Sequence, residues 1–442
     1  MTTSNSFDYS AVGAVQQSKA PLNFGLLDLL GKSEKPESGG ENGAHPQQFS
    51  LCLNDLVPPP ERKDKAEPSK DKSEPKLAEP DKTTAADMKL GFNELKKLLG
   101  CKDNDRISLN ELGKGLGDPQ ISGSQAQVLA ILKARFDQFD ALDPSKNPKD
   151  KGISAKAIEK FDQLQKDVKS GKRTDAGAVD FVNDVESLMK QMRDVTKDTV
   201  RSLYADEKNP LNSIKLEDVK QSFNPNCYFY GAVGAVLASD PEKIKDLIKD
   251  NKDGTYTVTF PGKDPEIVKA PSDAELMLYP KPGKDGTWMW VLEKAYGQYC
   301  MKHDQMFRKI MGYPDSPISQ DHTDGPGLFD EGLKILTGKG TNWALNIDKD
   351  KLAATLKDLT SEKPPRPITA DASFNVKTGE GAPVWGHTYS VLGYNAADKT
   401  ITLRNPWGST PPKDAKDLGD GKFSMTMDQF CKYFSKISYT DK

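Results

Sequence analysis

The sequence has few cysteines and histidines, and its cysteines form no recognisable pairs. Among 442 residues there are four histidines and five cysteines, namely Cys52, Cys101, Cys227, Cys300 and Cys431. The cysteines are odd in number and scattered, with no CxxC pair, which excludes a disulfide framework and a CxxC zinc site. They are therefore expected to be free thiols in a reducing compartment.

The sequence also lacks an excess of charge of one sign and a long apolar run. Its 62 basic and 65 acidic residues give a formal net charge of −3, which argues against a nucleic-acid partner. No apolar run approaches the roughly 18–20 residues that span a bilayer. The N-terminus has no charged-then-apolar start typical of a signal peptide. We expect a cytoplasmic monomer without a membrane span, with an unconventional export route left open.

Composition divides the chain into four predicted parts. Residues 1–87 contain a charged, proline-rich linker and brief apolar islands, so disorder is expected there. Residues 88–204 carry apolar positions at helical spacing and predict a small all-α domain. Residues 205–335 surround Cys227, and residues 336–442 contain several stretches with the alternation typical of strands. The predicted fold class is α+β.

Four helices are predicted within the all-α domain, from apolar positions that recur every three to four residues. The first places Leu90, Phe92 and Leu95 on one face, and the second is expected to begin at a Ser124 cap. The longest helix covers residues 181–195.

Two loops of this domain resemble calcium-binding EF-hand loops, at residues 101–111 and 143–154. Such a loop has an isoleucine at its eighth position and a glutamate ligand at its twelfth. Counted from Ile107 and Ile153, only the first loop places a glutamate, Glu111, at the twelfth position. A dication needs several converging oxygens, which neither loop supplies. We expect a degenerate helical pair used for packing and no required cofactor, with calcium binding as the alternative.

The stretch from Gln221 to Val236 places a cysteine between a polar turn and an apolar run. Pro225 and Asn226 do not suit a helix interior, and asparagine is a good N-cap, so Cys227 is expected in the first turn of a buried helix. Free N–H groups and the helix dipole lower a thiol pKa at such a position. The alternative is that Cys227 is only a small core residue.

A second stretch predicts a β-hairpin with a histidine near its end. Residues 385–394 and 400–405 are predicted strands, and residues 395–399 form a polar turn. Pairing across this turn places His387 and Asn405 at the same end of the sheet. An asparagine oxygen can fix the tautomer of an imidazole that acts as a base toward a thiol. Alternatively, His387 is a half-buried strand residue and Asn405 only opens a turn.

Gln221 is a candidate oxyanion donor because it lies six positions before Cys227. Its amide N–H groups could project beside the start of the helix, next to the Cys227 backbone N–H. Two donors that converge there would stabilise the oxyanion of a tetrahedral intermediate.

Several stretches resemble the protease core of calpain-family, papain-like cysteine peptidases in a bacterial-type form. They are Gln221–Ala238, Trp290–Tyr296, Gly386–Gly393 with Gly-His-Thr-Tyr-Ser, Leu403–Gly408 with Arg-Asn-Pro-Trp-Gly, and a closing strand and helix at Gly421–Met425 and Phe430–Phe434. The resemblance covers about half of the chain, from about residue 205 to the end. It implies a two-lobed core, with a helical lobe followed by an antiparallel β lobe.

The resemblance also implies a role for each candidate site residue. Cys227 would be the nucleophile, His387 the general base and acid, Asn405 the residue that orients His387, and Gln221 the oxyanion donor. Trp407 would shield the contact between His387 and Asn405 from water.

The turn before Cys227 departs from the family pattern. Pro225-Asn226 stands where the family usually has Gly-Asp, and Ser222 stands where it has glycine. The family's acidic residue near the nucleophile often helps to bind a core calcium, and Asn226 lacks that charge.

The predicted function is that of a cysteine endopeptidase of the calcium-dependent, calpain-like type. It would hydrolyse protein or peptide substrates through thiolate attack and an acyl-enzyme intermediate. One alternative is a catalytically silent calpain-like binding protein or effector scaffold. Another is acyl transfer of the transglutaminase kind, although that group normally takes an aspartate where Asn405 stands.

Overall fold

The computed structural model describes residues 85–101, 106–147, 150–222, 224–279, 281–303, 316, 318–323, 330–373, 383 and 386–442. Several sequence predictions lie wholly or partly outside these residues. They include the disordered region and linker up to residue 84, parts of both EF-hand-like loops, residue 223 in the stretch before Cys227, and Trp385 at the start of the predicted strand.

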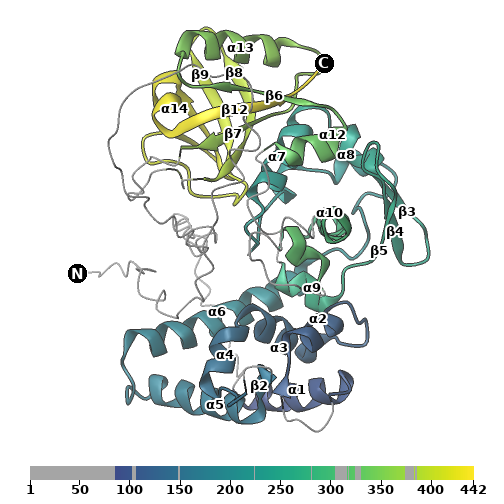
Figure 1. Ribbon diagram of the computed structural model, residues 1–442, viewed down its shortest axis with the longest axis vertical. Coiled ribbons are helices and arrows are strands. Elements are labelled where there is room, and N and C mark those ends of the chain that lie inside the picture. Colours follow the sequence, from purple (N-terminus) through teal and green to yellow (C-terminus); the bar gives the residue numbers. More distant parts are fainter. Residues whose placement is uncertain are drawn as a thin grey trace, which may run out of the picture.

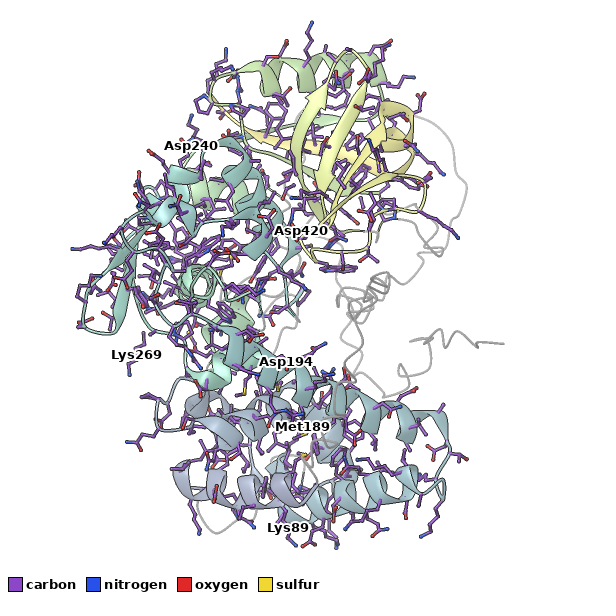
Figure 2. All side chains as sticks on the ribbon, turned by 180° about the vertical axis from the view of Figure 1, so that it is seen from behind. Lys89, Met189, Asp194, Asp240, Lys269 and Asp420 are labelled. Carbon is purple, nitrogen blue, oxygen red and sulfur yellow. The ribbon has the colours of Figure 1, made fainter. Side chains whose placement is uncertain are left out.

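A helical unit lies at one end of the molecule (Figure 1). Its helices are α1 (Ala85–Leu98), α2 (Leu109–Leu116), α3 (Gly123–Ala134), α4 (Phe136–Leu142), α5 (Ala155–Lys169) and α6 (Ala176–Asp198). Phe139, Phe161 and Phe181 meet in its core, with ring centroids 5.0 to 5.4 Å apart. Figure 2 shows Met189 inside this unit and Lys89 on its outer surface.

Two details of the predicted helices were wrong. Leu90 is 62% exposed, because α1 turns Met88, Phe92 and Leu95 toward the core instead. Ser124 is not a cap, since α3 already begins at Gly123.

The two EF-hand-like loops meet through a short antiparallel pair, β1 (Arg106–Ile107) with β2 (Ile153–Ser154). Ile107 lies opposite Ile153, and both side chains are fully buried. The loops therefore pair as EF-hand loops do, at the isoleucine position from which the ligand positions were counted.

Acidic side chains of these loops already have partners within the protein. Asp143 Oδ2 lies 3.3 Å from the Arg106 guanidinium and accepts the Ser154 hydroxyl at 2.8 Å, while its Oδ1 lies 3.0 Å from Lys160 Nζ. Glu111 accepts a hydrogen bond of 2.7 Å from the Ser108 amide and thereby caps α2. The degenerate pair used for packing stays a prediction, and calcium binding stays its alternative.

The middle of the molecule is built around two helices, α7 (Cys227–Ser239) and α10 (Trp288–His303). The Phe229 and Tyr296 rings of these helices stack with their centroids 4.2 Å apart in the core. Shorter elements surround them: η5 (Pro210–Asn212), η6 (Leu216–Asp218), α8 (Pro241–Leu247), α9 (Asp273–Leu278), η7 (Ser319–Thr323), α12 (Glu331–Thr337), and a sheet of β3 (Ile248–Asp250), β4 (Thr255–Val258) and β5 (Glu266–Lys269).

A larger antiparallel sheet occupies the other end of the molecule (Figure 1). Its strand order is β10-β11-β9-β8-β7-β12-β6. The strands are β6 (Thr341–Leu345), β7 (Ile368–Ala372), β8 (Thr388–Asn395), β9 (Thr400–Arg404), β10 (Lys416–Gly419), β11 (Lys422–Thr426) and β12 (Phe434–Thr440), with helices α13 (Lys349–Ser361) and α14 (Met427–Tyr433). Helices and antiparallel sheets in one chain confirm the predicted α+β class.

Helix α7 packs against this sheet through two glycines. A Cβ atom on Gly231 would lie 3.1 Å from Thr388 Cγ2, and one on Gly234 would overlap Ser390 Oγ. The Ser390 hydroxyl donates a hydrogen bond of 2.8 Å to the Gly231 carbonyl. The close approach brings the start of α7 beside the start of β8. Among the helices of the described residues, none is both long and apolar enough to cross a membrane.

Candidate active site

Cys227 is the first residue of α7, as the sequence predicts, but the expected side-chain cap is absent. The Asn226 side chain does not bond to the helix backbone. Its Nδ2 instead donates to Glu293 Oε1 at 2.9 Å and to Thr323 Oγ1 at 2.8 Å. These buried bonds tie the residue before Cys227 to α10 and η7.

The pKa of Cys227 is the main correction to the sequence prediction. The side chain is 6% exposed, and burial raises the pKa of the thiol to about 11. Hydrogen bonds from the Thr388 backbone and hydroxyl lower this pKa without offsetting the burial. The predicted low thiol pKa was wrong, because the cost of removing a thiolate from water outweighs the stabilisation that the helix start gives it.

His387 and Asn405 are in direct contact at one end of the sheet. His387 Nε2 lies 3.0 Å from Asn405 Oδ1, and both residues are almost completely buried. The hairpin register that places them there pairs Ser390 with Arg404 and Val391 with Leu403. This pairing agrees with the register expected from the polar turn.

The hydrogen bonds around Asn405 decide the tautomer of His387. The Trp407 backbone N–H also donates to Asn405 Oδ1, at 3.0 Å, so this atom is an acceptor. His387 Nε2 therefore carries a hydrogen, and in the neutral ring Nδ1 has a free lone pair. Nδ1 is buried and has no hydrogen-bond partner among the described residues.

Burial also acts on the His387 ring, which lies against Trp407. The two ring centroids are 4.6 Å apart, and Trp407 is 3% exposed. Burial lowers the pKa of His387 to about 4, although the hydrogen bond to Asn405 opposes this shift. The thiol of Cys227 and the imidazole of His387 are therefore both neutral at pH 7 in this structure.

Gln221 joins the turn before Cys227 to the turn after Asn405. Its backbone N–H donates to the Pro406 carbonyl at 2.8 Å, and its side-chain Nε2 donates to the Asn224 carbonyl at 2.7 Å. The amide group thus bonds to the polar turn rather than standing free beside the helix. Together with the contact between Cys227 and Thr388, these bonds bring all four predicted site residues into one region.

Sequence reasoning missed a buried ion pair next to the site. Lys281 Nζ lies 2.6 Å from Glu293 Oε2, and neither side chain is more than 1% exposed. The ammonium also lies 5.2 Å from the centre of the Trp290 ring. A glutamate inside the apolar run of α10 was the available signal, because a buried carboxylate needs a partner.

A cysteine at the start of a helix, a histidine directly before an adjacent strand and a side-chain oxygen bonded to that histidine are the arrangement of cysteine-dependent peptidases. The family model described as calpain family cysteine protease matches residues 179–415. This match covers more than half of the chain, which therefore belongs to the calpain family of cysteine proteases. No curated protein sequence matches the chain. The match includes Gln221, Cys227, His387 and Asn405, and it ends before the predicted closing strand and helix.

Proposed function

We propose that the protein is a cysteine endopeptidase that hydrolyses protein or peptide substrates. Its catalytic core would be two-lobed and papain-like, with Cys227 in the lobe at residues 205–335 and His387 and Asn405 in the β lobe at residues 336–442. The observation that carries the proposal is the 3.0 Å bond between His387 and Asn405, formed beside the start of α7.

The proposed chemistry follows from the free lone pair on His387 Nδ1. This nitrogen takes the proton of the Cys227 thiol as the sulfur attacks the substrate carbonyl, and Asn405 holds the ring through Nε2–H. The imidazolium then gives the proton to the leaving amine, and water hydrolyses the acyl-enzyme. Because both groups start neutral and buried, transferring the proton during attack avoids a separately ionised thiolate.

Gln221 is proposed as a donor to the oxyanion. Its Nε2 donates at 2.7 Å to the Asn224 carbonyl, three residues before Cys227. A developing oxyanion is a stronger acceptor than a neutral carbonyl, so it would compete for this donor. The Cys227 backbone N–H, at the open start of α7, would supply the second hydrogen bond.

We further propose that catalysis needs no bound calcium near Cys227. At the turn where the family often has an acidic ligand, Asn226 presents an amide that donates to Glu293. The other oxygen of Glu293 is bound by the Lys281 ammonium. The carboxylate is therefore already neutralised by a cation of the protein, and the residues do not fit a calcium ion at this position.

The proposed activity is tested by hydrolysis of an unfolded protein and of fluorogenic peptides by the full chain. Cys227→Ser is expected to abolish turnover, because a serine hydroxyl is much harder to deprotonate than a thiol. Cys300→Ser is the matched control, since Cys300 is also buried but lies in α10, and it should retain activity. Turnover in excess chelator should equal turnover with calcium. Undiminished hydrolysis by Cys227→Ser would refute the assignment of the nucleophile.

A further inference from the structure

A buried carboxyl group lies on the sheet face that α7 covers. Asp371 of β7 is 2% exposed and pairs in register with Thr388 of β8. The Thr388 hydroxyl donates to Asp371 Oδ1 at 2.8 Å. Asp371 Oδ2 has no hydrogen-bond partner among the described residues, although the Lys436 ammonium lies 3.5 Å away. The carboxyl group is therefore only partly neutralised.

Thr388 connects this carboxyl group to the proposed nucleophile. It follows His387 directly, it packs against Gly231 one turn along α7 from Cys227, and its backbone and hydroxyl lie close enough to the Cys227 sulfur to lower the pKa of the thiol. A threonine hydroxyl has a single hydrogen to donate. That hydrogen can point toward Asp371 or toward the sulfur, but it cannot serve both.

We propose that Asp371 is a positioning residue for the Cys227 sulfur and that it acts through the Thr388 hydroxyl. A protonated Asp371 donates to Thr388 Oγ1 and leaves the hydroxyl hydrogen free to bond to the sulfur. An ionised Asp371, having released its proton to solvent, holds that hydrogen itself. The inference rests on the proposed function, because it concerns Cys227 as the nucleophile.

The groups around Asp371 place the ionisation of its carboxyl group near neutral pH. Burial raises the pKa of Asp371 to about 7, the Lys436 ammonium on β12 opposes the shift, and Asp330 at the start of α12 adds to it. Cys227 on α7 is a further titratable neighbour of Asp371. The Asp371 carboxylate also raises the pKa of the Cys227 thiol by its charge. When Asp371 ionises, its charge and the loss of the Thr388 hydrogen bond would therefore both raise the pKa of the Cys227 thiol.

The substitution Asp371→Asn tests the proposal, because an amide stays neutral and can donate to Thr388 Oγ1 as the protonated acid does. The measurement is the rate of Cys227 alkylation by iodoacetamide from pH 5 to pH 12 in the full chain, followed by peptide mass mapping. We expect the midpoint of the rate profile to fall by about 1 pH unit, which makes alkylation at pH 7.5 about tenfold faster. An unchanged midpoint in a folded Asp371→Asn protein would overturn the proposal.

Thr388→Val and Thr388→Ser separate the hydroxyl from the charge and do not depend on the folding of Asp371→Asn. In the wild-type background below pH 7, where Asp371 is protonated, Thr388→Val should slow alkylation and Thr388→Ser should preserve its rate. In the Asp371→Asn background, Thr388→Val should reverse part of the decrease. Equal alkylation rates for Thr388→Val and Thr388→Ser below pH 7 would overturn the route through the hydroxyl.

The alkylation assay also separates this proposal from the proposed function. If Asp371→Asn shifts the alkylation midpoint as expected but the wild-type chain cleaves no peptide, the proposed peptidase activity is refuted. The coupling of Asp371 to the thiol then still stands. A wild-type chain that cleaves peptides and whose midpoint ignores Asp371→Asn refutes only the coupling. In an active enzyme, Asp371→Asn should change the pH profile of kcat and leave KM near its wild-type value.

Discussion

Asn226 donates a buried hydrogen bond of 2.9 Å to Glu293, which binds Lys281 through its other oxygen. The residue that precedes Cys227 is thus held by a charge pair from outside its own helix. The polar turn before α7 therefore depends on α10 for its position, which its local sequence does not reveal.

The charge pair predicts a large effect for Lys281→Met. The substitution leaves Glu293 buried without its cation, which costs about 3–5 kcal/mol of unfolding free energy. Adding Glu293→Gln should recover most of that loss, because the buried charge is then removed as well. Urea denaturation of both variants measures the effect.

A surface pair provides the control for Lys281→Met. Lys166 and Asp162 form an exposed ion pair one turn apart on α5, so Lys166→Met should change stability by only about 0–1 kcal/mol. Similar losses from Lys281→Met and Lys166→Met would show that Glu293 does not carry a buried charge.

Removal of the Asn405 side chain should affect turnover more than substrate binding. Asn405→Ala is expected to lower kcat by a factor on the order of 10 to 1000, because the His387 ring loses the bond that holds it. In a His387→Ala background, adding Asn405→Ala should cost little more. Steady-state kinetics of the single and double variants check this. Independent, multiplying losses would mean that Asn405 acts elsewhere.

Gly234→Ala should separate α7 from the sheet. The added methyl group would overlap Ser390 Oγ, and such overpacking costs about 1–3 kcal/mol. Gly177→Ala is the control, because that helical position in α6 has no atom within 4 Å of an added Cβ. It should be neutral or stabilising by up to about 1 kcal/mol. The measurement is thermal unfolding of both variants. Equal melting temperatures would contradict the packing argument.

The low pKa of His387 predicts an acid-dependent loss of stability. In the folded chain this pKa is about 4, below the ordinary value of 6.5, so the unfolded chain binds more protons between these pH values. Stability is therefore lost as the pH falls from about 6.5 toward 4. Relative to His387→Gln, the wild-type protein should lose on the order of 3 kcal/mol over this range in urea denaturation. Parallel pH profiles would show that His387 is not desolvated.

Local patterns in the sequence determined which chemistry-bearing residues belong together. The polar turn before Cys227 predicted where α7 begins, because proline and asparagine disfavour a helix interior and the apolar run that follows them favours one. Turn chemistry between the strands predicted the hairpin that brings His387 to Asn405, because pairing in an antiparallel hairpin follows from the position of its turn.

Tertiary structure decided the properties that depend on surroundings. The pKa of Cys227 rises to about 11 because residues distant in the sequence exclude water from the sulfur, an effect that local helix geometry does not contain. The partners of Asn226 come from α10 and η7, and the carboxyl group beside Thr388 comes from β7. Strand β6, which was not predicted, forms one edge of the sheet because it pairs antiparallel with β12. Strand pairing and desolvation are long-range effects, so only the folded chain could reveal them.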